Sequence, residues 1–377
     1  MNNFCSFCNS PFLTGTLLSY GRIAAIISLT ISTFACAAQM PAGCDRDERG
    51  PKIMENKYYD VVSLGELLID FTPYGKSGQG HDVLEANPGG GCCNVLSMVS
   101  KLGGKTAFLG KVGDDHFGHY LEETAREQKI DTQGVVFDKR WFTTLAFVHL
   151  DETGDRSFSF ARKPGADMMY EKEEVRTDIL EKSFIFHYST VAMSREPERS
   201  TVRYAVEFAK QAGCLLSFDP NIRPFLWDDM NEAVEMMKFG LSMCDILKIS
   251  EEELVLATGL EDIEKAIDVL HQQYPNIRLF LATLGKKGCY YKFGDITGMQ
   301  GTFTNVRTID TTGAGDTFIG CCLYRIAKQG GLVFTEKELA DMIRHANAAA
   351  SLITTRRGAM GVVPSSEEIE SLLQEAD

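Results

Sequence analysis

The chain has 377 residues, of which 44% are hydrophobic, and its formal net charge is −14. That length can bury a large core in one α/β domain or two smaller ones, and the negative charge argues against nucleic acid and anionic membranes as partners. The 11 cysteines are scattered through apolar stretches without a disulfide framework, which is typical of cytosolic proteins.

Residues 1–53 differ from the rest of the chain. Arg22 precedes an apolar run at 23–31, and Ala35-Cys36-Ala37 resembles a signal-peptidase site. The run is too short and too rich in Ser and Thr for a transmembrane helix. We expect a disordered extension that results from a start assigned too far upstream, with Met54 as the initiator. A secretion signal or an anchor is the alternative.

From residue 58 onward, strand-like and helix-like patterns alternate. The first strands are expected at 59–65 and 105–112, with a helix at 93–102 between them. The alternation continues with helices near 199–212, 229–240 and 262–273 and strands at 214–218, 246–249 and 278–284. Such alternation predicts a largely parallel sheet covered on both faces, with ligands at the carboxyl ends of its strands.

Two segments interrupt this rhythm. Residues 70–88 are polar and glycine-rich, and residues 143–161 alternate as paired strands around a turn at 151–155. We expect these segments, the second extending to about residue 163, to form a small antiparallel lid. The lid would project from a core domain that spans residues 54–377.

The segment from Asp310 to Asp316, D-T-T-G-A-G-D, is the most informative in the chain, and an apolar helical stretch follows it. A glycine turn that opens a helix is an anion site, because the first backbone N–H groups lack intrahelical partners and glycine allows close approach. Asp316 beside such a site is expected to accept a proton rather than to bind phosphate. An anion cradle next to a base suits phosphoryl transfer to a hydroxyl. A structural turn with Asp316 as a helix cap is the alternative.

Two more segments precede it, N-P-G-G-G-C-C-N at 87–94 and K-V-G-D-D-H-F-G at 111–118. Together with 310–316, they resemble the two signatures of the PfkB family of ribokinase-like carbohydrate kinases. The resemblance covers about residues 58–366 and is closest to bacterial fructokinases. It implies a three-layer α/β/α core with a mostly parallel sheet and the lid. Cys92-Cys93 replaces smaller residues of the family, and both side chains are small enough to fit.

The resemblance implies that Asp316 is the general base and that the backbone N–H groups of Gly313, Ala314 and Gly315 hold the transferred phosphoryl group. The residues implied in sugar binding are Asp70, Gly89, Gly90, Asn94 and Arg162.

Three of these residues have alternative interpretations. Asp70 could be a solvated carboxylate at a strand end, and Asn94 an N-terminal helix cap. Arg162 could be an exposed arginine in a surface salt bridge.

The cofactors implied by the resemblance are ATP and Mg²⁺, with K⁺ in some relatives. Glu253 would organise Mg²⁺ through water, since Mg²⁺ keeps several waters and needs few protein ligands. Asp310 would help to bind a monovalent cation. The residues implied on the nucleotide side are Lys248, Glu253, Thr283, Gly285, Gly288 and Asn347. The glycine turn and the Ala-rich helix among them could equally be packing features. Ser250 replaces an asparagine of many relatives, which argues against a direct role for it.

The sequence therefore predicts ATP-dependent phosphorylation of a sugar primary hydroxyl, with D-fructose giving fructose 6-phosphate. Alternatives are 2-keto-3-deoxygluconate kinase, which Arg162 and Arg223 keep open, or another sugar kinase of the family. A non-catalytic sugar-binding protein would not need Asp316, and a dehydrogenase would carry G-x-G-x-x-G. We expect a cytoplasmic location, where ATP is available, and a homodimer paired through the lid.

Overall fold

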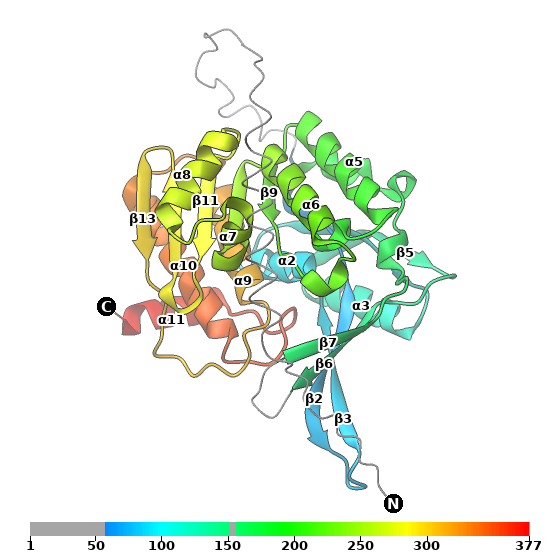
Figure 1. Ribbon diagram of the computed structural model, residues 1–377. Coiled ribbons are helices and arrows are strands. Elements are labelled where there is room, and N and C mark those ends of the chain that lie inside the picture. Colours follow the sequence, from blue (N-terminus) through cyan, green and yellow to red (C-terminus); the bar gives the residue numbers. More distant parts are fainter. Residues whose placement is uncertain (1–56, 151–155, 377) are drawn as a thin grey trace, which may run out of the picture.

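The computed structural model describes residues 57–150 and 156–376, so the N-terminal extension and the turn at 151–155 lie outside the described ranges (Figure 1). Within these ranges, no helix is both long enough and apolar enough to cross a membrane. The cysteines of the described part are all free and buried.

The main sheet of the described chain has nine strands in the order β13-β12-β11-β10-β9-β8-β1-β4-β5. The strands from β11 to β5 pair in parallel, and β12 and β13 add an antiparallel hairpin at one edge. The strands are β1 (Tyr59–Leu64), β4 (Thr106–Gly113), β5 (Ile130–Asp138), β8 (Ser183–Ser189), β9 (Leu215–Asp219), β10 (Ile246–Ser250), β11 (Leu279–Thr283), β12 (Cys289–Phe293) and β13 (Ile296–Gln300). The predicted parallel core is confirmed.

Helices cover both faces of this sheet (Figure 1). Successive strand residues point to opposite faces, so Val61 joins one hydrophobic core and Val62 the other. The first core is covered by α2 (Gly91–Lys101), α3 (His116–Glu127), α9 (Ala314–Gln329), α10 (Glu336–Ile353) and α11 (Ser366–Glu375). The second core is covered by α4 (Thr177–Glu181), α5 (Glu198–Gln211), α6 (Met230–Met243), α7 (Glu251–Thr258) and α8 (Ile263–Gln273). The molecule therefore has the predicted three layers.

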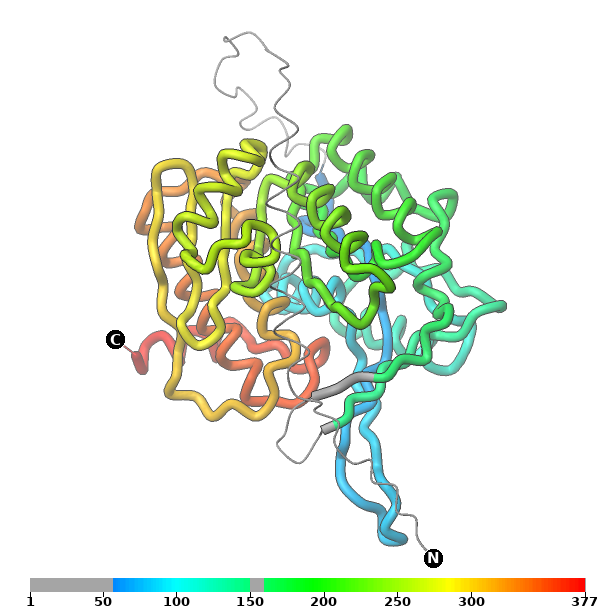
Figure 2. Tube along the Cα trace, in the orientation of Figure 1, coloured from blue at the N-terminus to red at the C-terminus, as the bar shows by residue number. Residues whose placement is uncertain are grey.

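The lid is a separate sheet of the order β3-β2-β6-β7. Its strands are β2 (Leu68–Lys76), β3 (Asp82–Gly89), β6 (Leu145–Leu150) and β7 (Arg156–Ala161). The β2–β3 and β6–β7 pairs are antiparallel as expected, but the central β2–β6 pair is parallel. The reason is that β2 and β6 both enter the lid from the main sheet, whereas β3 and β7 return toward it. The β2–β3 hairpin extends well away from the body (Figure 2).

Candidate functional site

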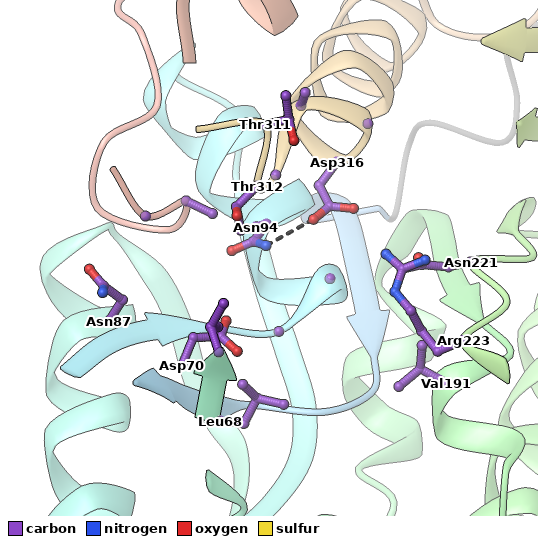
Figure 3. A pocket seen from close by; sticks show the side chains of 18 of the residues that line it. Leu68, Asp70, Asn87, Asn94, Val191, Asn221, Arg223, Thr311, Thr312 and Asp316 are labelled. Carbon is purple, nitrogen blue, oxygen red and sulfur yellow. Dashed lines mark hydrogen bonds between the residues drawn. The ribbon is translucent and has the colours of Figure 1, made fainter. Parts of the chain in front are cut away.

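A cavity of about 640 Å³ lies between the carboxyl edge of the main sheet and the lid (Figure 3). The main sheet, its helices and their loops contribute Asn221, Arg223, Lys248, Glu253 and the segment 309–316. The lid contributes Leu68, Asp70, Asn87, Val148 and Phe160. Of the residues that the sequence singled out, Asp70, Gly90, Asn94, Arg162, Lys248, Glu253, Asp310, Gly313, Ala314, Gly315 and Asp316 line this one cavity.

The cavity contains the N-terminus of α9, whose N-cap residue is Gly313. Gly313 has a φ of 74°, and a Cβ on it would lie 2.7 Å from the Cβ of Ala359, so only glycine fits this turn. The first N–H groups of a helix have no intrahelical acceptor, and the Ala314 N–H makes only a long 3.3 Å bond to the carbonyl oxygen of Thr311. These amides form the rim of the candidate anion-binding turn, residues 311–315.

Asp316 lies in the first turn of α9, next to this rim. Its Oδ2 accepts a 2.8 Å hydrogen bond from Nδ2 of Asn94, which connects α9 with α2 (Figure 3). Burial is the largest influence on Asp316 and raises the pKa of its carboxyl; the bond from Asn94 opposes this shift. A carboxylate with a raised pKa is a stronger proton acceptor, which suits a general base.

Asn94 lies inside α2, whose N-cap position is taken by Gly90. The interpretation of Asn94 as a helix cap is therefore wrong. Its Oδ1 is buried and has no partner among the described residues, so the amide keeps an acceptor for a ligand hydroxyl. Gly90 has a φ of 126°, and a Cβ there would lie 2.2 Å from the backbone oxygen of Glu66.

Asp70 is the third residue of β2 and therefore lies within a strand. From the sequence it was expected to follow a strand. Burial, followed by the charges of Glu66 and Asp310, raises the pKa of Asp70 to about 7. No hydrogen bond from the described residues contributes to that shift. Gly89 does not line the cavity; it faces Leu68 across the β2–β3 pair, and a Cβ there would lie 2.6 Å from Oδ2 of Asp70. Gly89 thus makes room for this carboxylate.

A buried group of charges lies behind the anion-binding turn. Lys248 Nζ is 2.8 Å from Oδ2 of Asp219, and it would lie 3.1 Å from a Cβ at Gly315. Glu253 accepts backbone hydrogen bonds from Ile222 (2.8 Å) and Ser250 (2.9 Å). Burial, reinforced by Asp219, raises the pKa of Glu253.

Ser250 has a structural role at the start of α7. Its hydroxyl accepts a 3.2 Å hydrogen bond from the Glu253 N–H, while the Glu253 carboxylate accepts one from the Ser250 N–H. This reciprocal pair is a capping box that starts α7. Ser250 therefore fixes the orientation of Glu253 toward the cavity.

Within the described ranges, no group of three or more His, Cys, Asp and Glu side chains is arranged to hold a metal ion. A divalent ion in this cavity would have few protein ligands and would keep most of its waters. That is the usual coordination of Mg²⁺ beside phosphates. Glu253 fits such a role, because each carboxylate oxygen retains a lone pair beyond its backbone hydrogen bond.

Known proteins match the chain over most of its length. The family model described as pfkB family carbohydrate kinase matches residues 59–366. The chain belongs to this family. Fructokinase-1 from Zea mays is 41% identical over 321 residues, which cover 84% of this chain and 98% of that protein.

Two solved structures of the same kind are also similar to this carbohydrate kinase. A fructokinase from Xylella fastidiosa with bound ATP has a TM-score of 0.75 and 31% identity, covering 85% of this chain and 99% of its own. A fructokinase from Vibrio cholerae O395 bound to fructose, ADP and calcium ion has a TM-score of 0.74 and 32% identity, covering 83% of this chain and 98% of its own. The predicted family and fold are confirmed.

Four residues predicted on the nucleotide side of this kinase, Thr283, Gly285, Gly288 and Asn347, do not line the cavity. Asn347 donates hydrogen bonds to the backbone oxygens of Gln300 (2.9 Å) and Gly301 (3.0 Å). Gly288 packs against the same strand end, since a Cβ on it would lie 2.1 Å from the Gln300 oxygen. Packing accounts for these two contacts, and a role with nucleotide stays a prediction.

Arg162 borders the cavity, but it is buried rather than exposed. Its Nε is 2.8 Å from Oδ2 of Asp167, and one terminal nitrogen is 3.5 Å from Oε2 of Glu198 on α5. The other terminal nitrogen donates a 3.4 Å bond to Ser194. The interpretation as an exposed salt-bridging arginine is wrong; a sugar contact stays a prediction.

Three residues that line the cavity had no role predicted from the sequence, namely Glu66, Asn87 and Asn221; Asp219 lies behind them, paired with Lys248. Glu66 follows β1, and its Oε1 accepts a 2.7 Å hydrogen bond from the Gly91 N–H at the start of α2. Asp219 ends β9, and Asn221 follows it with a φ of 44°. A polar residue at the carboxyl end of a parallel strand was the signal that could have identified Glu66, Asp219 and Asn221. Asn87 lies inside β3 of the lid and carries no such signal.

Proposed function

We propose that this carbohydrate kinase transfers the γ-phosphoryl group of ATP to the primary hydroxyl of D-fructose, giving fructose 6-phosphate and ADP. The observation that carries the proposal is the position of Asp316. It lies in the first turn of α9, beside the anion-binding turn, and faces the cavity that also contains Asp70. The similarity to fructokinases, one of them with fructose and ADP bound, supports the choice of sugar.

In the proposed mechanism, Asp316 accepts the hydroxyl proton while the hydroxyl oxygen forms a bond to the γ-phosphorus. The bond from that phosphorus to the bridging oxygen breaks, and ADP leaves with the electron pair. A general base of this kind contributes about 10²–10⁴ in rate. The amides at Gly313, Ala314 and Gly315 stabilise the charge on the equatorial phosphoryl oxygens, which is the main task of a phosphotransfer site.

The acceptor sugar would be held by the polar groups of the lid side. Asp70 would accept hydrogen bonds from two hydroxyls, and Asn94 has the free Oδ1 as acceptor. The main chain at Gly89 and Gly90 allows close approach. Arg162 is the remaining predicted contact, since each terminal guanidinium nitrogen has a second N–H.

Lys248 and Glu253 are the proposed groups for the phosphates and for Mg²⁺, which when bound supplies charge neutralisation. Asp310 is the proposed ligand of K⁺. Its Oδ1 accepts a 2.8 Å bond from Thr312 N–H, and its Oδ2 is 3.4 Å from the Gly358 nitrogen, so it joins the loop before α9 to the loop after α10. Thr283, Gly285, Gly288 and Asn347 stay the proposed nucleotide side.

Two further expectations belong to this proposal. Because the proposed reaction consumes ATP, we expect the enzyme to act in the cytoplasm. Residues 1–53, which lie outside the described ranges, are the part that could direct it elsewhere. A homodimer paired through the lid is the proposed assembly. Size-exclusion chromatography with light scattering checks the homodimer. Microscopy of the full chain and of the chain from Met54 checks the location.

The direct test is a coupled ADP-release assay with ATP and Mg²⁺ against fructose, 2-keto-3-deoxygluconate, ribose, glucose and adenosine. The full chain and the chain from Met54 are assayed beside Asp316→Asn, which can keep the hydrogen bond from Asn94 through its amide oxygen. We expect fructose-dependent turnover that falls about 10²–10⁴-fold in the variant.

Turnover with 2-keto-3-deoxygluconate alone would keep the mechanism and change the substrate. Arg223, which lines the cavity, favours this second candidate because its guanidinium could pair with the carboxylate of that sugar acid. No turnover with any acceptor, in a folded protein, would contradict the proposed reaction.

A further inference from the structure

Two phenylalanine rings connect the lid directly to the main body at the edge of the cavity. Phe160 on β7 and Phe225 on the short helix η6 (Pro224–Leu226) stack with ring centroids 5.2 Å apart and an interplanar angle of 22°. Both residues line the cavity. Offset stacking is a favourable geometry for aromatic rings and adds stabilisation beyond the area that they bury.

The ring on the body is held in a fixed position. Ile222 on one side of η6 donates its N–H to Glu253, and the Trp227 N–H on the other side donates to the Pro224 carbonyl oxygen at 3.2 Å. Trp227 is buried, and the guanidinium carbon of Arg199 lies 5.8 Å from the centroid of its ring. Phe225 therefore projects from a turn that is anchored at both ends, and its own side chain remains 51% exposed.

The ring on the lid belongs to an edge strand. β7 pairs only with β6, so its other edge has no strand beside it within the described chain. Immediately after β7, Arg162 is tied to Asp167 and Glu198 in the body. Phe160 thus lies two residues before a fixed point, on an edge strand of the lid.

Elsewhere the lid meets the body at its base, where Phe71 on β2 packs edge-on against Phe117 of α3 with ring centroids 5.6 Å apart. It also meets the body across the cavity from the stack. There, Asn87 on β3 approaches Gly358, and Oδ1 of Asn87 would lie 3.1 Å from a Cβ at that glycine. No hydrogen bond joins these two residues in the described structure. The Phe160–Phe225 stack is thus an aromatic contact that joins β7 to the body at the edge of the cavity.

We propose that the Phe160–Phe225 stack is a latch that keeps the lid closed over the acceptor sugar. The proposal rests on the proposed sugar kinase function and adds two positioning residues to it. The rings do not touch the reacting atoms in this scheme. They stabilise the closed arrangement in which Asp70 and Asp316 face one cavity, and they exclude water.

Water is the competing acceptor in this reaction. Its attack on the γ-phosphorus would give phosphate and ADP in place of sugar phosphate, with the proton again passing to the base. Closure over the sugar suppresses this reaction because it removes water from the site. A weakened latch should therefore raise the KM for the sugar and should increase the ADP formed per sugar phosphate.

The test compares Phe160→Leu, Phe225→Leu, Phe225→Ala and the Phe160→Leu/Phe225→Leu double variant with the wild-type full chain. We expect each single change to raise the KM for fructose roughly 3–10-fold, the range that one aromatic pair supports. The double variant should be no worse than the single ones, because the rings act as one unit. The ratio of ADP to sugar phosphate, which is one in a tight enzyme, should rise in all of them.

Phe142→Ala is the matched control, because Phe142 is 80% exposed on the segment that leads into β6. It should leave the KM and the product ratio unchanged. Effects of Phe160 and Phe225 that add fully in the double variant, or a product ratio that stays at one, would overturn the latch.

A second readout needs neither sugar nor turnover. Amide hydrogen exchange of β6 and β7 in the ligand-free protein should speed up in Phe225→Leu and Phe225→Ala but not in Phe142→Ala. Unchanged exchange would overturn the latch even if the kinase prefers another sugar. Absence of fructose turnover in the wild type would count against the proposed function alone.

Discussion

Along the carboxyl edge of the main sheet, the charged groups of the site are buried and paired, whereas the lid reaches the cavity from a sheet whose far end is in solvent. Lys248 and Asp219 form a 2.8 Å pair between adjacent strands of the core. At the tip of the lid, Lys76 and Asp82 form an ion pair in which both side chains are mostly exposed. Removing one partner of a buried ion pair is strongly destabilising, whereas an exposed ion pair contributes little to the stability of the fold.

This difference separates two tasks. The core, fixed by helices on both faces, holds the anion-binding turn and Asp316 in one geometry. The lid presents Asp70 on a sheet that meets the core at Arg162, at the Phe71–Phe117 ring contact and at the Phe160–Phe225 stack. Changes in the core should therefore reduce stability or kcat, whereas changes in the lid should reduce the affinity for the acceptor.

The largest expected effect concerns Arg162, where lid and core meet. Arg162→Met leaves Asp167 and Glu198 buried without their cation; the side chains of Arg162 and Asp167 are only 4% and 1% exposed. We expect the free energy of unfolding, measured by urea denaturation at pH 7, to fall by roughly 3–5 kcal/mol. Arg195→Met is the control, because its pair with Asp228 is largely exposed and should contribute at most about 1 kcal/mol.

If Arg162→Met changes the stability no more than Arg195→Met does, the buried cluster does not tie the lid to the core. A large rise in KM for the sugar with unchanged stability would instead support the predicted direct contact of Arg162 with the substrate.

The next effect tests the anion-binding turn. Gly313→Ala places a Cβ against Ala359 at a φ of 74° and should displace the amides of α9. We expect kcat to fall roughly 10²–10³-fold, as on loss of an oxyanion-hole donor. Gly213→Ala is the matched control, because its φ is 75° and its Cβ would meet nothing within 4 Å.

Gly213→Ala should cost about 1–2 kcal/mol of stability, because it forces alanine into the left-handed region; Gly313→Ala should cost at least as much, since its Cβ also meets Ala359. Only Gly313→Ala should change kcat. An equal loss of activity in the two variants would show that backbone strain, and not the position of the amides, controls the rate.

The core was predictable from sequence because its signals are local. Alternating strands and helices need only hydrophobic periodicity, and the glycine turn before α9 marks its own helix. The lid was predictable as a pair of polar, strand-forming segments. The parallel pairing of β2 with β6 was not, since it depends on where distant segments leave the main sheet.

The site was predictable only in part, because motifs identify single residues but not the contacts between distant segments. Asp316 and Asn94 were each identified from a motif, but their 2.8 Å hydrogen bond joins positions 222 residues apart. The burial of Arg162 depends on Glu198 of α5, and Glu66 acquires its role from Gly91. Partners of this kind are set by tertiary packing and leave no local pattern.

The smallest expected effect is a pH dependence that belongs to the lid. Since burial raises the pKa of Asp70 to about 7, this group is mostly neutral at pH 6 and mostly ionised at pH 8. An ionised carboxylate can accept hydrogen bonds from two hydroxyls, whereas the neutral acid must donate one. We expect the dissociation constant for fructose, measured by calorimetry without nucleotide, to fall roughly tenfold from pH 6 to pH 8.

Asp70→Asn should bind fructose weakly at both pH values and remove this dependence, whereas Asp82→Asn at the exposed lid tip should retain it. The folded protein keeps the Asp70 proton to about pH 7, but the unfolded chain releases it near 4. Asp70 therefore lowers the stability of the ligand-free enzyme as pH rises through that window, and Asp70→Asn should be more stable than wild type at pH 8 but not at pH 4. A flat wild-type dissociation constant between pH 6 and pH 8 would contradict the assignment and would move the acceptor's hydroxyl contacts to the core side of the cavity.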